Sequence, residues 1–301
     1  MLKYIGKKVL IAIATVFVLA TATFFLMKLI PGDPFLNDKI PVAVQDKQRA
    51  FYGLDKPVPQ QYMTYMNNLL HGDLGYSIKK TGKTVVDIIK EAFPVLGLIS
   101  LLFAEAVGLF FGILCAQFRG KWPDYLLMVV AVLGIALPSM VLGPILRMIF
   151  GVKLGILPVT GWGKPNQIIL PALVLGLGTV AGNTRNMRAS MLAITTQDYV
   201  KTARAKGLSP IRVVLKHQFK NSLVPIIPNL GVQIAGVLMG SFVVESMFLI
   251  PGLGRYFVDS VTNLDYPLIM GLTVFYGAFL VTMNLIVDVL YGLIDPRIRV
   301  K

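Results

Sequence analysis

Few side chains in this 301-residue sequence have the type and spacing that chemistry requires. The two histidines, His71 and His217, are far apart, and neither is accompanied by another histidine or a cysteine. The single cysteine, Cys115, lies inside an apolar run, so the sequence offers neither a disulfide framework nor a thiolate metal site. Gly82-Lys83-Thr84 ends like a phosphate-binding loop, but Ser77 stands where that motif requires its first glycine. We therefore predict no catalytic site and neither ATP nor a metal ion bound by this chain.

Two polar residues lie in or beside apolar runs that are long enough to cross a membrane. Glu105 is inside the run 95–118, and Asn183 follows another such run. A carboxylate near the middle of a bilayer costs about 2.5 kcal/mol or more, so it normally faces a cavity or a partner. We expect Glu105 and Asn183 to line a path through the membrane. A structural hydrogen bond between helices would explain Glu105 equally well.

A polar segment, residues 195–220, interrupts the long apolar runs and predicts two short helices joined by a hinge. Thr195 and Thr196 offer side-chain oxygens for an N-cap. Asp198 falls in the first turn, where the helix dipole favours an acid. Gly207 is expected to adopt the left-handed conformation that ends a helix.

The two predicted helices of this segment carry three kinds of helical face. The second helix has an apolar stripe of Ile211, Val214, Leu215 and Phe219 and a basic stripe of Arg212, Lys216 and Lys220, while the first has a small-residue face of Val200, Ala203 and Gly207. The pattern indicates a surface presented to a cytoplasmic partner. A helix lying on anionic lipid headgroups would show similar charges. A nucleic-acid partner is not expected, because there is no second basic patch or soluble domain.

The composition places these residues in a helical membrane protein that crosses the bilayer several times. Hydrophobic residues make up 55% and charged residues 15% of the chain, and its mean hydropathy is +0.70. In such a protein the net charge of +14 is expected to sit mainly in cytoplasmic segments.

Six apolar runs are expected to span the membrane: residues 9–27, 95–118, 125–149, 168–182, 223–244 and 268–287. The first is too long for the ~7–15-residue apolar core of a signal peptide. Pro138 and Pro144 are expected to kink the third span. Two glycine pairs at four-residue spacing are expected to allow close helix packing: Gly108 with Gly112, and Gly236 with Gly240.

The basic residues predict the orientation of these spans. The short segments assigned to the cytoplasm hold Lys3, Lys7, Lys8, Arg119, Lys121, Arg185, Arg188, Lys201, Arg204, Lys206, Arg212, Lys216, Lys220, Arg297, Arg299 and Lys301. The two short loops on the other side hold only Lys153, Lys164 and Arg255. Both termini and residues 185–220 are therefore expected in the cytoplasm, with 35–90 and 250–266 outside.

The segment Asp198-Tyr199-Val200-Lys201-Thr202-Ala203-Arg204-Ala205-Lys206-Gly207-Leu208 resembles the EAA loop of ABC importer permeases. More narrowly, it resembles the B-type permease subunit of the oligopeptide, dipeptide and nickel branch. Lys201 replaces the glutamate that names the loop, and the proline that ends the loop is displaced to Val224-Pro225. Further stretches resembling this family are Tyr52–Pro57, Gly72–Ser77, Val244–Arg255, Asp265–Pro267 and Asp295–Arg299.

The resemblance implies an all-α membrane protein with the type I importer fold. This fold has six transmembrane helices: a five-helix MetI-like core and an extra N-terminal span. The implied divisions are an N-terminal helix at 1–30, an extracytoplasmic region at 31–94, a permease core at 95–292 with coupling helices at 195–220, and a cytoplasmic tail at 293–301.

The resemblance also implies a role for the chain. It would form half of a translocation pore for oligopeptides in a bacterial cell membrane. A second, homologous permease, two ATPase subunits that bind ATP and Mg, an extracytoplasmic substrate-binding protein and membrane lipid would be its partners, and the chain itself would be no enzyme and bind no cofactor. The implied ATPase-coupling residues are Asp198, Tyr199, Lys201, Thr202, Ala203, Arg204, Ala205, Gly207 and Leu208.

Other functions remain open at this point. A permease of the same family could carry nickel or metal chelates, although the sequence has no cluster of metal-ligating side chains. A secondary transporter driven by an ion gradient through Glu105 would usually contain an internal repeat, and none is evident. A purely structural membrane scaffold would leave the basic helix pair at 195–220 unexplained.

Overall fold

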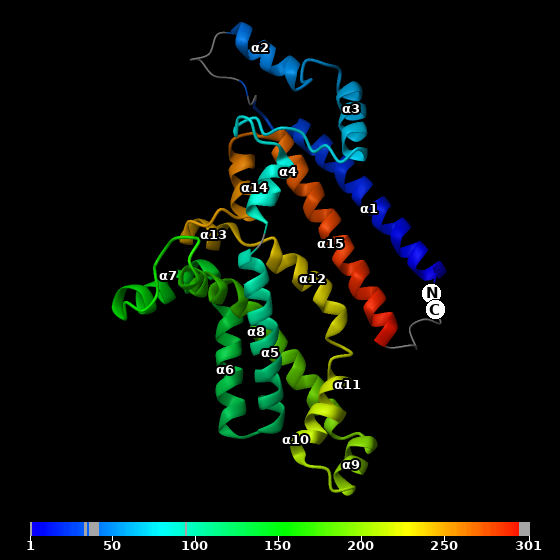
Figure 1. Cartoon of the computed structure of the whole chain (residues 1–301), viewed down its shortest axis with the longest axis vertical. Coiled ribbons are helices and arrows are strands. Elements are labelled where there is room, and N and C mark those ends of the chain that lie inside the picture. Colours follow the sequence, from blue (N-terminus) through cyan, green and yellow to red (C-terminus); the bar gives the residue numbers. More distant parts are fainter. Residues whose placement is uncertain (1, 33–34, 36–41, 94, 295–301) are drawn as a thin grey trace.

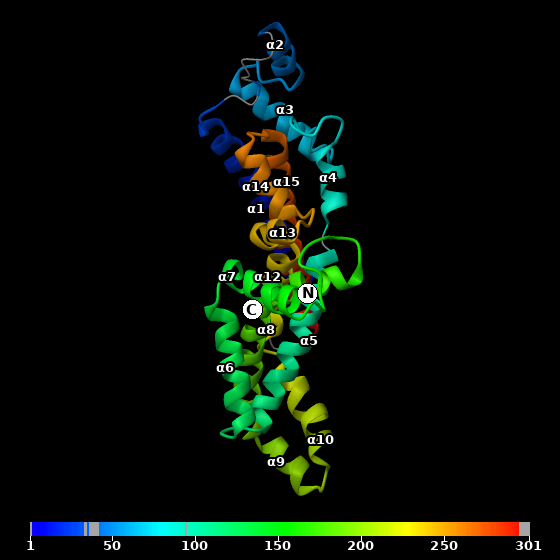
Figure 2. The same cartoon turned by 90° about the vertical axis from the view of Figure 1, so that its left-hand side faces the viewer.

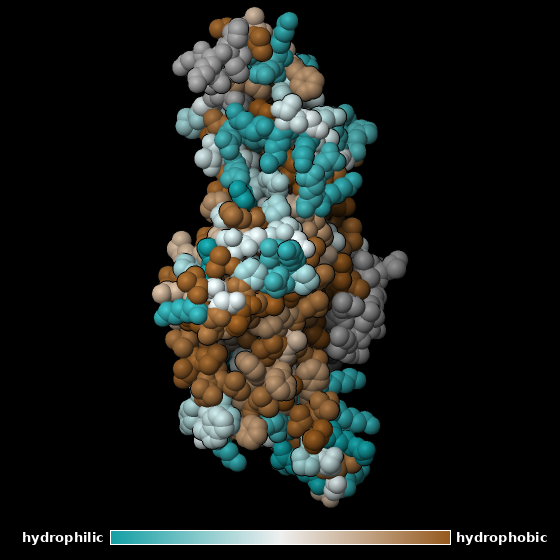
Figure 3. Space-filling view, turned by 60° about the vertical axis from the view of Figure 1, so that its left-hand side comes forward, coloured by the Kyte–Doolittle hydropathy of each residue, from teal (hydrophilic) through white to brown (hydrophobic). Residues whose placement is uncertain are grey.

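The computed structural model describes residues 2–32, 35, 42–93 and 95–294, and almost all of its regular structure is helical. The molecule is elongated in both perpendicular views (Figures 1 and 2). Helices α2–α4 and α14 lie at one end, and α9–α11 lie at the other. Figure 3 shows an apolar band between these two more polar ends, as expected for a protein that crosses a bilayer.

The helices fall into three groups by position. The middle group, which lies between the two polar ends, comprises α1 (Leu2–Leu29), α5 (Val95–Gln117), α6 (Trp122–Ala136), α7 (Ser139–Leu146), the π-helix η1 (Arg147–Lys153), α8 (Pro165–Thr195), α12 (Ile227–Leu238), α13 (Phe242–Phe248) and α15 (Tyr266–Ile294). One polar end holds α2 (Val42–Phe51), α3 (Val58–Leu70), α4 (Val85–Ala92) and α14 (Leu253–Thr262). The other holds α9 (Asp198–Ala205), α10 (Pro210–Arg212), the π-helix η2 (Val213–Phe219) and α11 (Lys220–Ser222).

Five helical segments of the described chain are long and apolar enough to cross a membrane, or six if the bent pair α6 and α7–η1 counts as one span. The third span is therefore not the kinked rod that the sequence predicted. The chain turns by 115° between α6 and α7. Leu137, which precedes Pro138, is extended with ψ 115, because the proline ring disfavours a helical conformation in the preceding residue. Pro144 lies inside α7 and does not end it.

The fourth span is longer than predicted, because α8 continues without a break to Thr195. An ion pair between the buried Asp124 and the partly buried Arg188 fixes this extension to the start of α6. Arg188 donates from Nε and Nη2 to the two carboxylate oxygens of Asp124, each at 2.7 Å. Asp124 also accepts the Gly120 N–H at 3.0 Å. The two-pronged contact is the strong form of such a pair and sets both the register and the orientation of α8.

The fifth predicted span is divided as well. Gly240 has φ +73 and lies in the turn between α12 and α13, so it cannot be part of a helix-packing motif. The carboxylate of Glu245 occupies the space that a Cβ at Gly240 would need, and it accepts the Arg255 N–H at 2.7 Å. A Cβ added at Gly236 would meet no atom within 4 Å. The predicted packing role of Gly236 and Gly240 is therefore wrong.

The other glycine pair does lie in a close helix contact. A Cβ at Gly108 would come within 2.9 Å of the Val180 carbonyl oxygen, and one at Gly112 within 2.8 Å of the Thr184 carbonyl oxygen. Helices α5 and α8 thus approach until side chains of one meet the backbone of the other. Such close approach is how helices associate where lipid supplies no hydrophobic driving force.

The extra N-terminal helix lies along α15 (Figure 1). Its Leu19 side chain fills the space above Gly277 of α15. Near one end of this contact the Lys8 amine donates to the Asp288 carboxylate at 2.7 Å. The contact explains how a helix outside the five-helix core remains fixed to it.

Asp265, which is 1% exposed, anchors the loop after α3 to the start of α15. Its carboxylate accepts the Ser77 hydroxyl, the Ile78 N–H at 3.0 Å and the Lys79 N–H at 3.2 Å. The same loop then leads into α4, whose capping box pairs Thr84 with Asp87. Hydrogen bonds from Thr84 hold the pKa of the Asp87 carboxyl below its ordinary value.

Replacing Asp265 should release this loop. In Asp265→Ala the backbone N–H groups of Ile78 and Lys79 lose a charged acceptor, at a cost of about 1–3 kcal/mol. We expect trypsin to cut after Lys79 and Lys80 faster than in the wild-type protein, and the thermal midpoint to fall. Asp259→Asn on the exposed face of α14 is the matched control and should change neither. Equal cleavage rates for Asp265→Ala and the wild-type chain would contradict this role of Asp265.

Candidate functional site

The segment at the α9–α11 end folds as two helices joined by a tight turn, and its first boundary differs from the prediction. Helix α9 begins after Gln197, which makes no side-chain cap. Thr195 and Thr196 instead donate their hydroxyls to the carbonyls of Met191, at 2.8 Å, and Ala193, at 3.2 Å. Their side chains therefore complete α8 and leave the first turn of α9 to Asp198.

Gly207 ends α9 as the sequence predicted, with φ +75. Its N–H donates to the Arg204 carbonyl at 2.9 Å, and the Leu208 N–H donates to the Ala203 carbonyl at 3.4 Å. This pair of hydrogen bonds is a Schellman motif, which needs a left-handed residue at the position of Gly207. A Cβ at this glycine would meet nothing within 4 Å, so a larger residue would strain only the backbone of this chain.

The two helices enclose a small apolar core of their own. Val200, Ala203 and Val213 are buried in it at 0%, 4% and 2% exposure, with Ile194 and Leu208 packed around them. Val200 and Ala203 therefore pack closely, as expected of a small-residue face, but against η2 of this chain. Their small size serves the packing of α9 against η2.

The outer surface of this unit is a mixture of charged, polar and large apolar side chains. It comprises Asp198, Tyr199, Lys201, Thr202, Arg204, Ala205, Lys206, Ile211, Arg212, Leu215 and Lys216, all exposed. Ile211 and Leu215 are 72% and 59% exposed. Apolar side chains of this size among cations are typical of a surface that another protein covers.

Gln218, which the sequence did not single out, joins this unit to two long helices. Its side chain is 0% exposed and lies in η2. It donates to the Thr195 hydroxyl of α8 at 3.2 Å and accepts from the Gln117 amide of α5, also at 3.2 Å. Ser190 of α8 adds a hydrogen bond to the Ser222 carbonyl at 2.8 Å. The interruption of the apolar stripe by a glutamine was the only sequence signal for this joint.

A second group of polar side chains lies where α5, α8 and α12 meet. The Gln233 amide of α12 donates to Asn183 Oδ1 of α8 at 3.0 Å. Asn183 is 0% exposed, and the half-exposed Glu105 of α5 lies beside it. The structure thus brings the two predicted path residues together and adds Gln233, which the sequence analysis missed.

This polar group, Glu105, Asn183 and Gln233, retains unused hydrogen-bonding capacity. Glu105 Oε1, Asn183 Nδ2 and Gln233 Oε1 are buried and have no hydrogen-bond partner. Gly236, three residues after Gln233, leaves open space on its own side of α12. In the part of the chain that the structure describes, no three histidine, cysteine or acidic side chains could hold a metal ion together.

The chain matches two protein-family models and several known proteins. Residues 108–300 match the family model of the binding-protein-dependent transport system inner membrane component, and residues 1–101 match the model of its N-terminal region. The chain is 43% identical to the dipeptide transport system permease protein DppB of Bacillus subtilis, covering 99% of this chain and 98% of that protein. It is 42% identical to the oligopeptide transport system permease protein OppB of Haemophilus influenzae, covering 99% and 100%.

A solved structure supports the fold independently. A chain of the MetNI methionine ABC transporter in inward-facing conformations matches with a TM-score of 0.54 at 16% identity, covering 70% of this chain and 96% of that one. The predicted MetI-like helical fold is confirmed, and so is the expectation of a permease subunit that is not itself an enzyme. The chain belongs to the family of binding-protein-dependent transport system inner membrane components.

Proposed function

We propose that the chain forms half of the membrane pore of an ATP-driven importer of short peptides. The observation that carries the proposal is the exposed surface of the α9–α11 unit, which Gln218 ties to α5 and α8. Peptides are the favoured substrates because the relatives named above are dipeptide and oligopeptide permeases. Nickel or a metal chelate is the second candidate within the same branch, whereas the family match leaves no support for an ion-gradient-driven transporter.

In this proposal the partners follow the architecture of the family. An ATPase subunit, which binds ATP and Mg, docks on the α9–α11 unit, and a second ATPase docks on a second, homologous permease. A substrate-binding protein delivers the peptide from the opposite side of the membrane. Two apolar side chains, Ile211 and Leu215, supply contact area for the ATPase, and the surrounding lysines and arginines supply charge complementarity.

The orientation is part of the same proposal. The α9–α11 unit and both termini lie in the cytoplasm of a bacterial cell, while α2–α4 and α14 lie outside it. The division into 1–30, 31–94, 95–292 and 293–301 is retained, with residues 1, 33–34, 36–41, 94 and 295–301 outside the described chain. The excess of lysine and arginine at the α9–α11 end supports this assignment.

The polar group of Glu105, Asn183 and Gln233 is the proposed contact with the translocation path. Glu105 is a partly exposed acidic residue on a transmembrane helix, and such a residue is not left facing lipid, so this face of α5 borders either the path or the second permease. The group's two unused acceptors and one unused donor are buried here, so they would hydrogen-bond the N–H and C=O groups of a passing peptide backbone once the surrounding helices move apart. Contacts to the backbone would admit peptides of many sequences.

The coupling role predicts an asymmetry between two glycines in left-handed turns. Gly207 and Gly120 have φ +75 and +73, and a Cβ at either would meet nothing within 4 Å. Valine at either position should therefore cost the isolated chain a similar amount, about 1–2 kcal/mol. We expect Gly207→Val to lose ATPase subunits during purification and to lose uptake, because it distorts the docking surface. Gly120→Val is the matched control; equal ATPase retention by the two variants would contradict docking on α9–α11.

A second prediction concerns the polar group in the membrane. Gln233→Leu keeps the size of the side chain but removes its hydrogen bond to Asn183 and its free acceptor. We expect peptide uptake to fall by about tenfold, the equivalent of one hydrogen bond of roughly 1.4 kcal/mol, with ATPase retention unchanged. Glu105→Gln, which keeps a hydrogen-bonding group, should be milder than Glu105→Leu. Full uptake in both Gln233→Leu and Glu105→Leu would show that these side chains do not contact the path.

A further inference from the structure

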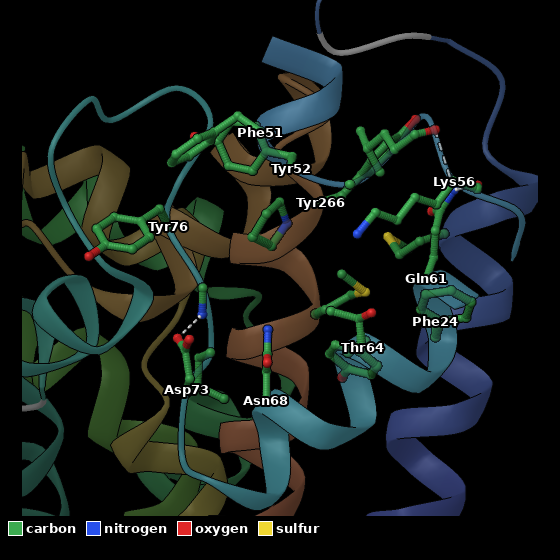
Figure 4. A pocket seen from close by; sticks show the side chains of 18 of the residues that line it. Phe24, Phe51, Tyr52, Lys56, Gln61, Thr64, Asn68, Asp73, Tyr76 and Tyr266 are labelled. Atoms are coloured by element: carbon green, nitrogen blue, oxygen red, sulfur yellow. Dashed lines mark hydrogen bonds between the residues drawn. The ribbon is translucent and has the colours of Figure 1, made fainter. Parts of the chain in front are cut away.

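A cavity of ≈ 260 Å³ lies at the α2–α4 end of the molecule, away from both sites described above. The ends of α1 and α2, the inner face of α3, the loop at residues 73–76 and the start of α15 enclose it (Figure 4). Glu105, Asn183 and Gln233 do not line this cavity. The cavity is therefore part of neither the exposed surface of the α9–α11 unit nor the proposed path.

Aromatic rings form much of the wall, and the hydroxyl groups of two of them, Tyr52 and Tyr266, are engaged elsewhere, whereas the Tyr65 hydroxyl is buried without a hydrogen-bond partner. The Tyr52 hydroxyl donates to the Ser77 carbonyl at 3.2 Å, and the Tyr266 hydroxyl donates to the Gly32 carbonyl at 3.0 Å. Phe24 is 3% exposed and stacks on Tyr65 with 5.6 Å between ring centroids. Anchored in this way, the rings offer preformed apolar surface, which suits a hydrophobic side chain of a ligand.

Two polar side chains point into the cavity with their hydrogen-bonding groups free. Figure 4 shows the Lys56 amine and the Asn68 amide directed toward its centre, from opposite walls. Neither group makes a hydrogen bond or an ion pair within the described chain. The turn that carries Lys56 is held in place, because Gln61 donates to the Lys56 carbonyl at 2.6 Å and accepts from the Lys28 amine.

The charges around the cavity favour one negative charge in the ligand. Lys28 and Lys56 are the lysines of the lining, and Asp73 is its acid. One carboxylate oxygen of Asp73 is occupied by the Gly75 N–H at 2.8 Å. The Tyr65 phenol is uncharged at neutral pH in any case, and burial raises its pKa further, to about 12. A single free amine opposite an amide donor suits a carboxylate better than a phosphate, which usually takes several cationic donors.

We propose that this cavity binds the C-terminal residue of a short peptide. The terminal carboxylate pairs with the Lys56 amine and accepts from the Asn68 amide, while the last side chain, apolar or aromatic, lies against Phe24, Tyr52 and Tyr266. The volume fits a single large residue, so the rest of the peptide extends toward solvent. The inference rests on the proposed function in taking peptides as the ligand class, but it assigns a second peptide site on the outer side of the membrane.

Binding of a peptide acid and its amide tests the proposal directly. The probes are the tripeptide Ala-Ala-Phe with a free carboxylate and the same tripeptide as its C-terminal amide, titrated against the full chain in phosphatidylcholine nanodiscs by microscale thermophoresis. We expect the wild-type chain to bind the acid about tenfold more tightly than the amide, as one charge-assisted hydrogen bond would give. Lys56→Gln should weaken binding of the acid about tenfold and leave the amide unchanged.

Controls separate this site from general effects of charge and from the permease function. Lys47→Gln removes an exposed lysine from α2, outside the cavity lining, and should bind both probes as the wild-type chain does. Since the Lys56 amine has no partner, its removal should leave the tryptic pattern intact. Equal binding of acid and amide, as expected if lipid occupies the cavity, or an acid preference that survives in Lys56→Gln, would overturn the proposal. Neither result depends on ATPase retention, which tests the permease assignment separately.

Discussion

The close contact between α5 and α8 is the interaction on which the rest of this structure depends. Gly108 and Gly112 have no side chains, so α8 lies directly on the α5 backbone. Thr184 is then near enough to donate to the Gly108 carbonyl at 3.3 Å, and Asn183 is brought beside Glu105. Polar groups in a bilayer must find partners inside the protein, and this contact supplies one for the Thr184 hydroxyl.

An ion pair holds α8 in place at a second level, closer to the end of the molecule that we propose faces the cytoplasm. Arg188 and Asp124 join α8 to the start of α6, and the turn from α5 to α6 contributes the Gly120 N–H. Asp124 is the buried member of this pair, so removing Arg188 would leave its carboxylate without its charged partner, which costs more than the pair itself contributes. The register of α5, α6 and α8 is therefore set by glycine contacts at one level and by charge at another.

The sequence predicted the features that depend on local rules and failed where tertiary contacts decide. The apolar runs of α1, α5 and α15 are long and uninterrupted, and Gly207 is followed by a new helix start, so each was recognisable from its own neighbourhood. The break at Leu137 was not, because a proline in a membrane helix can either kink it or end it. Gly240 has the spacing of a packing glycine, but it lies in a turn with φ +73, and the Glu245 carboxylate, five residues further along the chain, fills the space that a side chain would need.

The missed polar residues share a different cause. Gln218 and Gln233 are single polar side chains in apolar segments, and a sequence pattern does not identify the partner that makes such a residue important. Each proved to contact α8, and Asn183, the predicted path residue beside Gln233, belongs to α8 itself. The importance of Gln218 and Gln233 comes from hydrogen bonds between helices, so it became apparent only once the position of α8 was known.

Helix α8 is consequently the element that both proposed sites share. At one end of α8, Thr195 accepts a hydrogen bond from Gln218 of the α9–α11 unit. Further along, Asn183 accepts one from Gln233 beside the proposed path. The two residues are twelve positions apart, which corresponds to about 18 Å of continuous helix. The α9–α11 unit has its own buried core of Val200, Ala203 and Val213, and such a packed core resists deformation. The unit is therefore expected to move as one body when a partner pushes on its surface. In the proposed function, displacement of that unit would pass along α8 as a rigid rod and change the spacing of Glu105, Asn183 and Gln233, so α8 would link ATPase docking to the path.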